Sequence, residues 1–576
     1  MQILHVGRYG YTPQNVSASD TKAPISPFPA RALTGEEVEQ TIEDYAHCAK
    51  MAQVGGYDGV EIMGSEGYLI NQFIVKKTNL RTDGWGGSYE NRIKFPIEIV
   101  RRTRERVGEN FIIIYRLSML DLVDGGSTWE EVVQLAKEIE KAGATIINTG
   151  IGWHEARVPT IGTIVPKGGF AWVTKRMMGE VNIPLVATNR INMPDVAEKI
   201  LQDDCSDMVS MARPFLADAD WVLKAMEKRS NEINTCIACN QACLDHTFTM
   251  QVCSCIVNTR ACHETELNYP PAKVKKKLAV VGAGPAGLAA ATIAAERGHQ
   301  VDLFEAEKEI GGQFNMAKVI PGKEEYAQTI RYYGEMIKKH KVNLHLNHKV
   351  TAKELEAGKY DEIIIATGVL PRKLHFEGID HPKVLDYADV LYRNKPVGKS
   401  VAIIGAGGIG FDMAEYLSHD MEHESPTMNV EAYMKEWGVD MNYTRGGSLA
   451  EAPKPLASPR EVYLLKRSKG KHGKKLGKTT GWIHRSSLAM KEVKMLQQVT
   501  YEKVDDAGLH ITVAGEAQVL PVETVVVCAG QESLPDLYES LFASGQKLHI
   551  IGGAHNAKEL DAKRAIKEAS YLVAEI

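Results

Sequence analysis

The chain has 576 residues, enough for roughly three or four domains. Hydrophobic residues make up 44% and charged residues 24% of it, as in ordinary globular proteins, and the net charge of −5 argues against nucleic acids or membrane surfaces as partners. Four of the nine cysteines lie in one cluster, and the first residues do not resemble a signal peptide. Both features predict a reducing, cytoplasmic location. The apolar run 278–295 is interrupted by glycines and a proline, so we do not read it as a membrane span.

Residues 1–232 alternate short apolar strands with amphipathic helices, which predicts a parallel sheet. A capping box at Thr34 and Glu37 marks the start of one helix, and another follows Ser127 and Thr128. The count of strands is two short of a closed (β/α)8 barrel, so either the sheet is open or two units are missing upstream. The predicted strands span 2–6, 57–62, 111–116, 145–149, 184–188 and 207–211.

Polar side chains recur where these strands end, and in a barrel that edge holds the chemistry. A lone arginine there is usually solvated or ion-paired, but a polar group at every strand end is harder to explain in that way. Arg190 and Arg213 follow the last two strands, where barrels usually bind a phosphate, and they fit the phosphate of FMN. The other polar groups at these ends are His5, Arg8, Glu61, Glu66, Tyr68, Arg116, Asn148, His154, Glu155 and Asn189.

A cysteine cluster with the spacing C-x2-C-x3-C-x11-C follows this half and comprises Cys236, Cys239, Cys243 and Cys255. Three of these thiols lie on one short loop, which favours an iron-sulfur cluster. Structural zinc is the alternative, although zinc sites more often pair two C-x2-C knuckles across a longer gap. Cys253 lies two residues before Cys255 and would point the other way in an extended chain.

A first glycine-rich fingerprint, with Gly282, Gly284 and Gly287, follows a strand and opens a helix. Glu305 ends the next strand, where a carboxylate binds the ribose of a dinucleotide. The run from Glu305 to Gln313 is similar to that of FAD proteins with two dinucleotide-binding domains.

A second fingerprint has Gly405, Gly407 and Gly410. Its next strand ends in Lys466 and Arg467 instead of a carboxylate, which suits the 2′-phosphate of NADPH, the alternative being a merely basic loop. An insertion at about 419–460 lies between this fingerprint and that strand, and the sequence assigns it no function.

Several motifs resemble the Old Yellow Enzyme flavoprotein barrels, namely 67–73, 82–92 and 211–215. With the cysteine spacing, the runs 63–68 and 149–157 resemble the iron-sulfur members, in particular the bacterial NADPH-dependent 2,4-dienoyl-CoA reductases. Old Yellow Enzymes that reduce simple enones carry two histidines where this chain has Met63 and Glu66, which weakens a general ene-reductase interpretation. The resemblance implies two further βα units upstream, so we expect a truncated chain with weakened FMN binding.

The resemblance implies reduction of 2,4-dienoyl-CoA to enoyl-CoA in the β-oxidation of unsaturated fatty acids. Electrons would pass from NADPH through FAD, a 4Fe-4S cluster and FMN, with Tyr68 as proton donor and His154 and Glu66 beside it. The expected flavin-binding residues are Gln2, His5, Arg116, Asn189, Arg190, Ala212 and Arg213. An enoate or bile-acid reductase is the alternative, as is a truncated chain with only NADPH diaphorase activity.

The predicted fold is α/β, a (β/α)8 flavoprotein barrel lacking its first two βα units, followed by two Rossmann-like domains. We expect an acyl-CoA substrate and a monomer or weak oligomer. The predicted domains are the partial barrel at 1–232, the cluster loop at 233–275, the FAD domain at 276–375 with 531–576, and the NADPH domain at 376–530.

Overall fold

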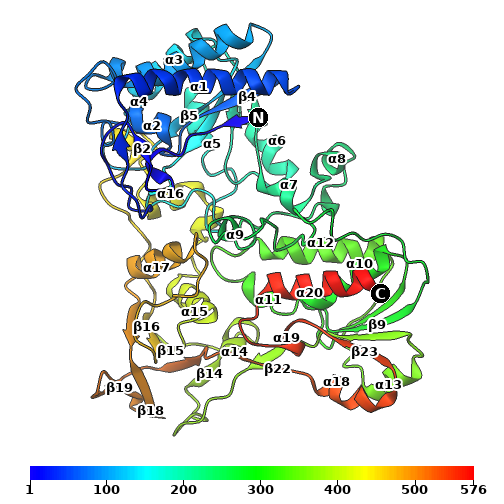
Figure 1. The fold of residues 1–576 in the computed structure, drawn as a ribbon. Coiled ribbons are helices and arrows are strands. Elements are labelled where there is room, and N and C mark those ends of the chain that lie inside the picture. The colour runs from blue at the N-terminus through cyan, green and yellow to red at the C-terminus, as the bar shows by residue number, and fades with distance from the viewer. The chain divides into compact units, whose positions relative to one another are not determined.

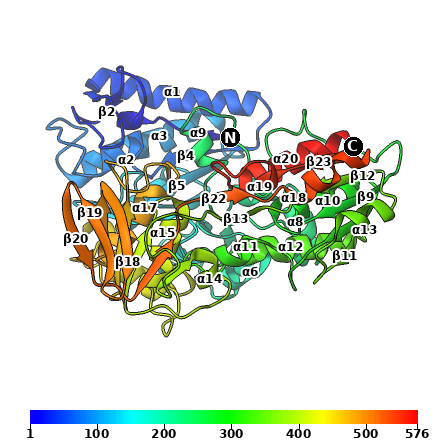
Figure 2. The same cartoon turned by 90° about the horizontal axis from the view of Figure 1, so that it is seen from below.

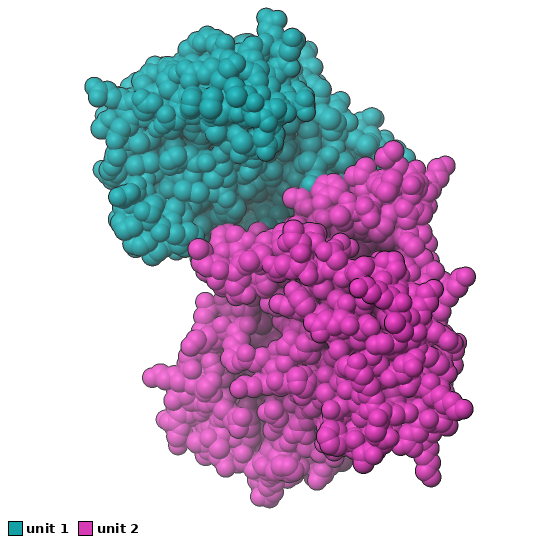
Figure 3. Space-filling model, turned by 45° about the vertical axis from the view of Figure 1, so that its right-hand side comes forward, with its two compact units in different colours: residues 1–161, 165–211, 426–455 teal, residues 162–164, 212–425, 456–576 magenta.

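The computed structural model describes residues 1–576, which form two compact units, coloured separately in Figure 3. The first unit comprises residues 1–161, 165–211 and 426–455, and the second comprises 162–164, 212–425 and 456–576. None of the helices combines the length and the apolar character needed to cross a membrane.

The first unit is built on a parallel six-stranded sheet whose strand order follows the sequence. Each predicted strand is present, and the sheet is open, with the first and last strands at its edges. The predicted α/β barrel class, with fewer strands than a closed barrel, is therefore confirmed. The strands are β1 (Gln2–Ile3), β4 (Gly59–Gly64), β5 (Ile112–Leu120), β6 (Ile146–Ile151), β7 (Leu185–Ala187) and β8 (Met208–Val209).

Helices connect these strands, and their ends follow from local sequence signals. The capping boxes at Thr34 and Thr128 both form, because each hydroxyl accepts from the backbone N–H three residues on, and the glutamate there reaches back. The helices are α1 (Gly35–Val54), α2 (Leu69–Ile74), α3 (Tyr89–Val107), α4 (Trp129–Lys141), α5 (Ala171–Met177) and α6 (Pro194–Gln202), and a two-stranded ribbon joins β2 (Val16–Ser17) and β3 (Arg31–Ala32).

The second unit begins with the short helices α7 (Arg213–Ala217), α8 (Trp221–Met226) and α9 (Leu244–Thr247) and then contains two dinucleotide-binding folds. The first fold has a parallel sheet of β11 (Asn343–His345), β10 (Gln300–Phe304), β9 (Lys277–Val281), β12 (Glu362–Ile365) and β23 (Lys547–Ile550), in that order. Figure 1 shows its helices α10 (Pro285–Glu296), α12 (Tyr326–Lys339) and α20 (Ala562–Glu575) side by side, and their apolar faces share one core. Its shorter helices are α11 (Phe314–Ala317), α13 (Ala352–Ala357), α18 (Asp536–Leu541) and α19 (Gly552–His555).

The second dinucleotide fold has the parallel sheet β14 (Val384–Asp386), β21 (Thr524–Val527), β15 (Ser400–Ile404), β16 (Glu461–Lys466) and β17 (Lys494–Gln497). Its helices are α14 (Tyr387–Leu391), α15 (Gly408–Ser418) and α17 (Gly481–Met490). Figure 2 shows the antiparallel strands β18 (Val499–Asp505), β19 (Gly508–Val513) and β20 (Glu516–Leu520) beside each other, and a ribbon pairs β13 (Val369–Pro371) with β22 (Gln531–Ser533).

The boundaries of the units differ from those of the predicted domains. Residues 162–164 and 212–232, expected in the barrel, fold with the second unit. Residues 426–455 lie in the sequence of the second dinucleotide fold, between α15 and β16, yet they belong to the first unit and include α16 (Val430–Trp437). Sequence periodicity reports local structure only, so it gave no sign of either placement.

Candidate functional site

Tyr68 and His154 form a close pair at the strand ends of the first unit. Tyr68 follows β4 and begins α2, and His154 lies in the loop after β6. The hydroxyl of Tyr68 lies 2.6 Å from Nε2 of His154, and the rings meet edge to face. Burial, followed by the negative charge of Glu66, raises the pKa of Tyr68 to about 12. Tyr68 therefore keeps its proton at neutral pH and holds it at a defined position.

A carboxylate and a guanidinium stand beside this pair, as the sequence predicts. Oε1 of Glu66 accepts an ion-pair contact of 2.9 Å from Arg116, and its Oε2 lies 3.8 Å from Nε2 of His154. Glu66 adopts a left-handed backbone with φ of 61°, which is uncommon for a residue other than glycine. The structure thus brings together all three predicted catalytic residues and one predicted flavin residue.

Asp121, which the sequence analysis missed, joins the loops that carry this site. Its buried carboxylate accepts hydrogen bonds from the Ser118 hydroxyl at 2.8 Å, Trp153 Nε1 at 2.8 Å and Asn71 Nδ2 at 3.2 Å. The backbone N–H of Ser127 donates to its other oxygen at 2.8 Å. One carboxylate therefore links the end of β5, the loop after β6 and helix α2. No sequence motif marks it, because its partners are scattered along the chain.

A second buried network contacts the same pair and joins Arg8 and Glu155, both noted at strand ends in the sequence, to Tyr9, which was not. Arg8 donates to Oε2 of Glu155 at 2.5 Å, and the Tyr9 hydroxyl donates to the same oxygen at 3.2 Å. Tyr9 meets the rings of Tyr68 and His154 edge to face, with centroids 6.0 Å and 5.8 Å away. Tyr9 is therefore held by an ion pair and in turn limits the positions open to both aromatic rings.

The other predicted flavin residues of the first unit lie in strand β1 or in the loops after neighbouring strands. Gln2 Nε2 donates to Oε2 of Glu61 at 2.6 Å, and His5 Nδ1 accepts from the backbone N–H of Gly7. Asn189 and Arg190 both have left-handed backbones, and their side chains donate to the carbonyls of Thr160 and Val165. Ala212 and Arg213 belong to the second unit.

The four predicted cysteine ligands line one pocket in the second unit, together with Arg213. Cys253 and Cys262 do not line it. Burial raises the pKa of Cys239 to about 12 and also raises the pKa of Cys243, whereas the charge of Arg213 opposes the shift at both thiols. Arg213 also donates to Oδ1 of Asn240 at 2.5 Å, within the cysteine loop.

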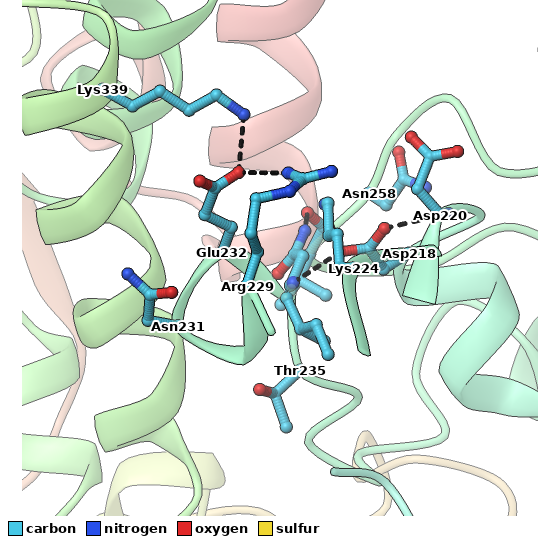
Figure 4. A network of polar contacts seen from close by, with 12 residues as sticks. Asp218, Asp220, Lys224, Arg229, Asn231, Glu232, Thr235, Asn258 and Lys339 are labelled. Atoms are coloured by element: carbon cyan, nitrogen blue, oxygen red, sulfur yellow. Dashed lines mark hydrogen bonds and ion pairs between the residues drawn. The ribbon is translucent and has the colours of Figure 1, made fainter. Parts of the chain in front are cut away.

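The segment that leads into this loop is fixed by the polar network in Figure 4. Asp218 accepts from Lys224 Nζ at 2.6 Å and from the backbone N–H of Asn234 at 2.8 Å. Glu232 accepts from Arg229 at 2.6 Å and from Lys339 at 2.7 Å. The segment before the cysteine loop is therefore held by ion pairs at Asp218 and at Glu232.

Both glycine fingerprints have the geometry that a dinucleotide requires. A Cβ at Gly287 would meet the carbonyl oxygen of Gly282 at 1.8 Å, and one at Gly410 would meet that of Gly405 at the same distance. Only glycine therefore allows these close contacts between helix and strand. A Cβ at Gly407 would point into open space, which leaves room for phosphates to approach the backbone.

In each dinucleotide fold, the residues at the end of the second strand (β10 and β16) were predicted to contact the nucleotide. Oε2 of Glu305 accepts from the backbone N–H of Ala283 at 2.7 Å, so its carboxylate lies against the first fingerprint. Gln313 accepts from Gln531 Nε2 at 2.9 Å. Lys466 donates to the carbonyls of Gly470 and Lys471, so it braces its own loop, and no side-chain hydrogen bond involves Arg467.

Comparison with known proteins extends over almost the whole chain. Residues 1–232 match the NADH:flavin oxidoreductase / NADH oxidase family, and residues 276–555 match the pyridine nucleotide-disulphide oxidoreductase family. A metal reductase of Desulforamulus reducens is 33% identical over 96% of this chain and 82% of its own length. A cinnamate reductase of Clostridium sporogenes is 28% identical over 95% of this chain and 79% of its own. The solved structure of a 2-naphthoyl-CoA reductase complex superposes with a TM-score of 0.89 at 31% identity, covering 100% of this chain and 84% of that one.

These matches define a class of flavin-dependent oxidoreductases in which an FMN barrel precedes a domain for FAD and a nicotinamide nucleotide. The chain belongs to this family of FMN/FAD flavoprotein reductases. The resemblance to Old Yellow Enzyme barrels is confirmed at this level, whereas the matches do not single out the dienoyl-CoA reductases within it.

Replacing Glu66 by Gln should lower the pKa of Tyr68 from about 12, because the carboxylate disfavours a phenolate beside it. Removing that negative charge also leaves the positive charge of Arg116 unopposed, which acts in the same direction. The shift can be followed by 19F NMR of fluorotyrosine at position 68 as a function of pH. Glu61→Gln is the matched control, and an equal shift in both variants would contradict the assignment to Glu66.

Proposed function

We propose that this chain reduces a carbon–carbon double bond conjugated to a carboxylic acid or to its thioester, with electrons from a nicotinamide nucleotide. The observation that carries the proposal is the Tyr68–His154 pair, a protonated phenol held at the strand ends of a flavin barrel. The relatives named for cinnamate and 2-naphthoyl-CoA support this broad class. A 2,4-dienoyl-CoA is one member of this substrate class. The relatives support the alternative, an enoate reductase, better than a dienoyl-CoA reductase.

The first task for the protein is to hold FMN. Nε of Arg116 is buried without a hydrogen-bond partner, and an acceptor on the flavin ring would satisfy it. Gln2 in strand β1, and His5 and Arg190 in the loops after their strands, offer further polar groups. These residues therefore fit a bound FMN. When bound, the flavin would supply a hydride to the carbon of the conjugated double bond that lies farther from the carbonyl.

The second task is to deliver a proton to the carbon next to the carbonyl. Tyr68 holds that proton on its hydroxyl, and its pKa of about 12 means that it gives the proton up only as negative charge develops on the substrate. His154 stands 2.6 Å from this hydroxyl and orients it. Burial lowers the pKa of His154, which favours the neutral imidazole at pH 7.

The cysteine pocket supports the proposal of a 4Fe-4S cluster. The four cysteines line one pocket, as the four iron ligands of such a cluster would. Such a cluster supplies one-electron transfer between carriers that exchange electron pairs.

Tyr68→Phe should slow the turnover of a conjugated acid or thioester by about 10²–10⁴, the usual cost of losing a general acid. Reduction of the bound FMN by the nicotinamide nucleotide should continue at the same rate. The comparison uses stopped-flow and steady-state kinetics with cinnamate, cinnamoyl-CoA and a 2,4-dienoyl-CoA, which also ranks acids against thioesters. Tyr115→Phe is the control, because that buried hydroxyl has no hydrogen-bond partner. Unchanged turnover in Tyr68→Phe would remove Tyr68 from the mechanism.

Cys255→Ser should lose iron and the brown absorbance, since Cys255 lines the pocket with the other three thiols. Cys253→Ser and Cys262→Ser should keep both, because these residues lie outside the pocket. Iron analysis with absorbance spectra of the three purified variants decides the matter. Iron lost from the Cys253 or Cys262 variant and retained in Cys255→Ser would overturn the ligand assignment.

We also propose NADPH as the preferred nucleotide, on the basis of the basic loop after β16. Because Lys466 braces that loop, Arg467 is the better candidate for the 2′-phosphate. Arg467→Ala should lower the ratio of kcat/KM for NADPH to that for NADH by about tenfold or more, as one charge-assisted contact contributes roughly 1.5–3 kcal/mol. Lys475→Ala, which breaks an ion pair with Glu559, is the control. Equal kcat/KM for both nucleotides in the parent chain would refute the preference.

A further inference from the structure

Residues 426–455, which we call the barrel strap, leave the second dinucleotide fold after α15 and return to it before β16. In between they fold onto the first unit, where α16 lies among the barrel elements in Figure 1. The sequence assigned this insertion no function. Its contacts concentrate on the two loops that surround the candidate site.

Two buried tyrosines of the strap donate hydrogen bonds to backbone carbonyls of the barrel. The hydroxyl of Tyr433 lies 2.6 Å from the carbonyl oxygen of Pro159, and that of Tyr443 lies 3.1 Å from the carbonyl oxygen of Met119. Tyr433 is fully buried, and Tyr443 is 7% exposed. Each buried hydroxyl of the strap therefore has its hydrogen-bond partner in the backbone of the barrel.

The strap also pairs with the barrel through its backbone. Gly447 accepts from the backbone N–H of Leu122 at 3.0 Å and donates to the carbonyl of Ser127 at 2.8 Å. Its φ is +76°, and a side chain there would meet the carbonyl oxygen of Val123 at 2.3 Å. A side chain at Gly126 would meet Gly447 Cα at 2.8 Å. These two glycines therefore allow the strap and the loop after β5 to bring their backbones into direct contact.

A third contact holds the part of the strap that lies between Tyr433 and Gly447 in the sequence. Arg176 in α5 lies over the ring of Trp129, 4.8 Å from its centroid, and donates to the carbonyl of Asn442 at 2.9 Å. Tyr443 packs on the same tryptophan, with ring centroids 5.6 Å apart. The arginine and the tryptophan thus hold the turn that presents Tyr443 to Met119.

The loops that the strap holds are the loops that carry the candidate site. Pro159 lies in the loop after β6 with His154, and the next residue, Thr160, accepts from Asn189. Ser127 belongs to the loop after β5, whose Asp121 accepts from Trp153 beside His154. The strap therefore contacts both the loop that carries His154 and the loop that carries Asp121.

We infer that the barrel strap positions the loops after β5 and β6 for the reduction of the conjugated double bond, with Tyr433 and Tyr443 as its positioning residues. This inference rests on the proposed function for its link to turnover. A segment of the nucleotide-binding half thereby completes the site of the barrel half.

The test uses the full chain loaded with its flavins and compares the double variant Tyr433→Phe/Tyr443→Phe with Tyr115→Phe. Amide hydrogen exchange should become about tenfold faster in peptides from 118–127 and 153–160 of the double variant only, with helix α1 as the unchanged reference. The kcat for cinnamate or the dienoyl thioester should fall about tenfold. Oxidation of NADPH by ferricyanide should stay the same, because it needs only the second unit.

Four outcomes decide between the possibilities. Unchanged exchange in both loops, or faster exchange everywhere, overturns the inference. Faster exchange in the loops with unchanged kcat also overturns it, since the strap would then be structural only. If the parent chain reduces none of these alkenes, the proposed function fails separately. In that case the strap is upheld if the double variant shows faster loop exchange and a raised FMN dissociation constant, and it is rejected otherwise.

Discussion

The candidate site of the first unit depends on one buried carboxylate. Asp121 has no exposed surface and accepts hydrogen bonds from Asn71, Ser118, Trp153 and the backbone of Ser127. A buried carboxylate is costly unless several donors satisfy it, so the donors and the loops that bring them must assemble together. Asn71 in turn accepts from the backbone N–H of Gly67, next to Tyr68. The position of the phenol is therefore set by a chain of contacts that ends at Asp121.

The two halves of the chain solve different physical problems. The barrel half needs a few polar side chains at defined positions, and it obtains them from loops held by carboxylates, by Arg8 and by the strap. The nucleotide half needs backbone close to phosphates, and it obtains this from glycines where a single Cβ would collide with a carbonyl oxygen. The cysteine loop, which belongs to the second unit, starts from an anchored segment in which Glu232 joins Arg229 and Lys339.

Much of this organisation was predictable because it is local. Strand and helix positions follow from periodicity and from caps such as Thr34 and Thr128, and the strand order follows from strict βα alternation. Tyr68, His154, Glu66 and Arg116 could be expected near one another because the carboxyl ends of parallel strands meet at one edge, whereas their roles followed only from the family resemblance. The four cysteines share a pocket because most of them lie on one short loop.

The amino-acid sequence by itself therefore determined the fold class, the two fingerprints and the core of the candidate site. Only the tertiary structure decided the roles of Asp121, Tyr9 and the barrel strap, and it placed Arg213 beside the cysteines and Lys466 within its own loop. The physical reason is the distance along the chain between the residues in contact. Spacing along the chain reports neighbours in one strand, turn or loop, whereas the bond from Tyr433 to Pro159 joins residues that no periodic pattern relates. Such contacts exist only once both segments are folded.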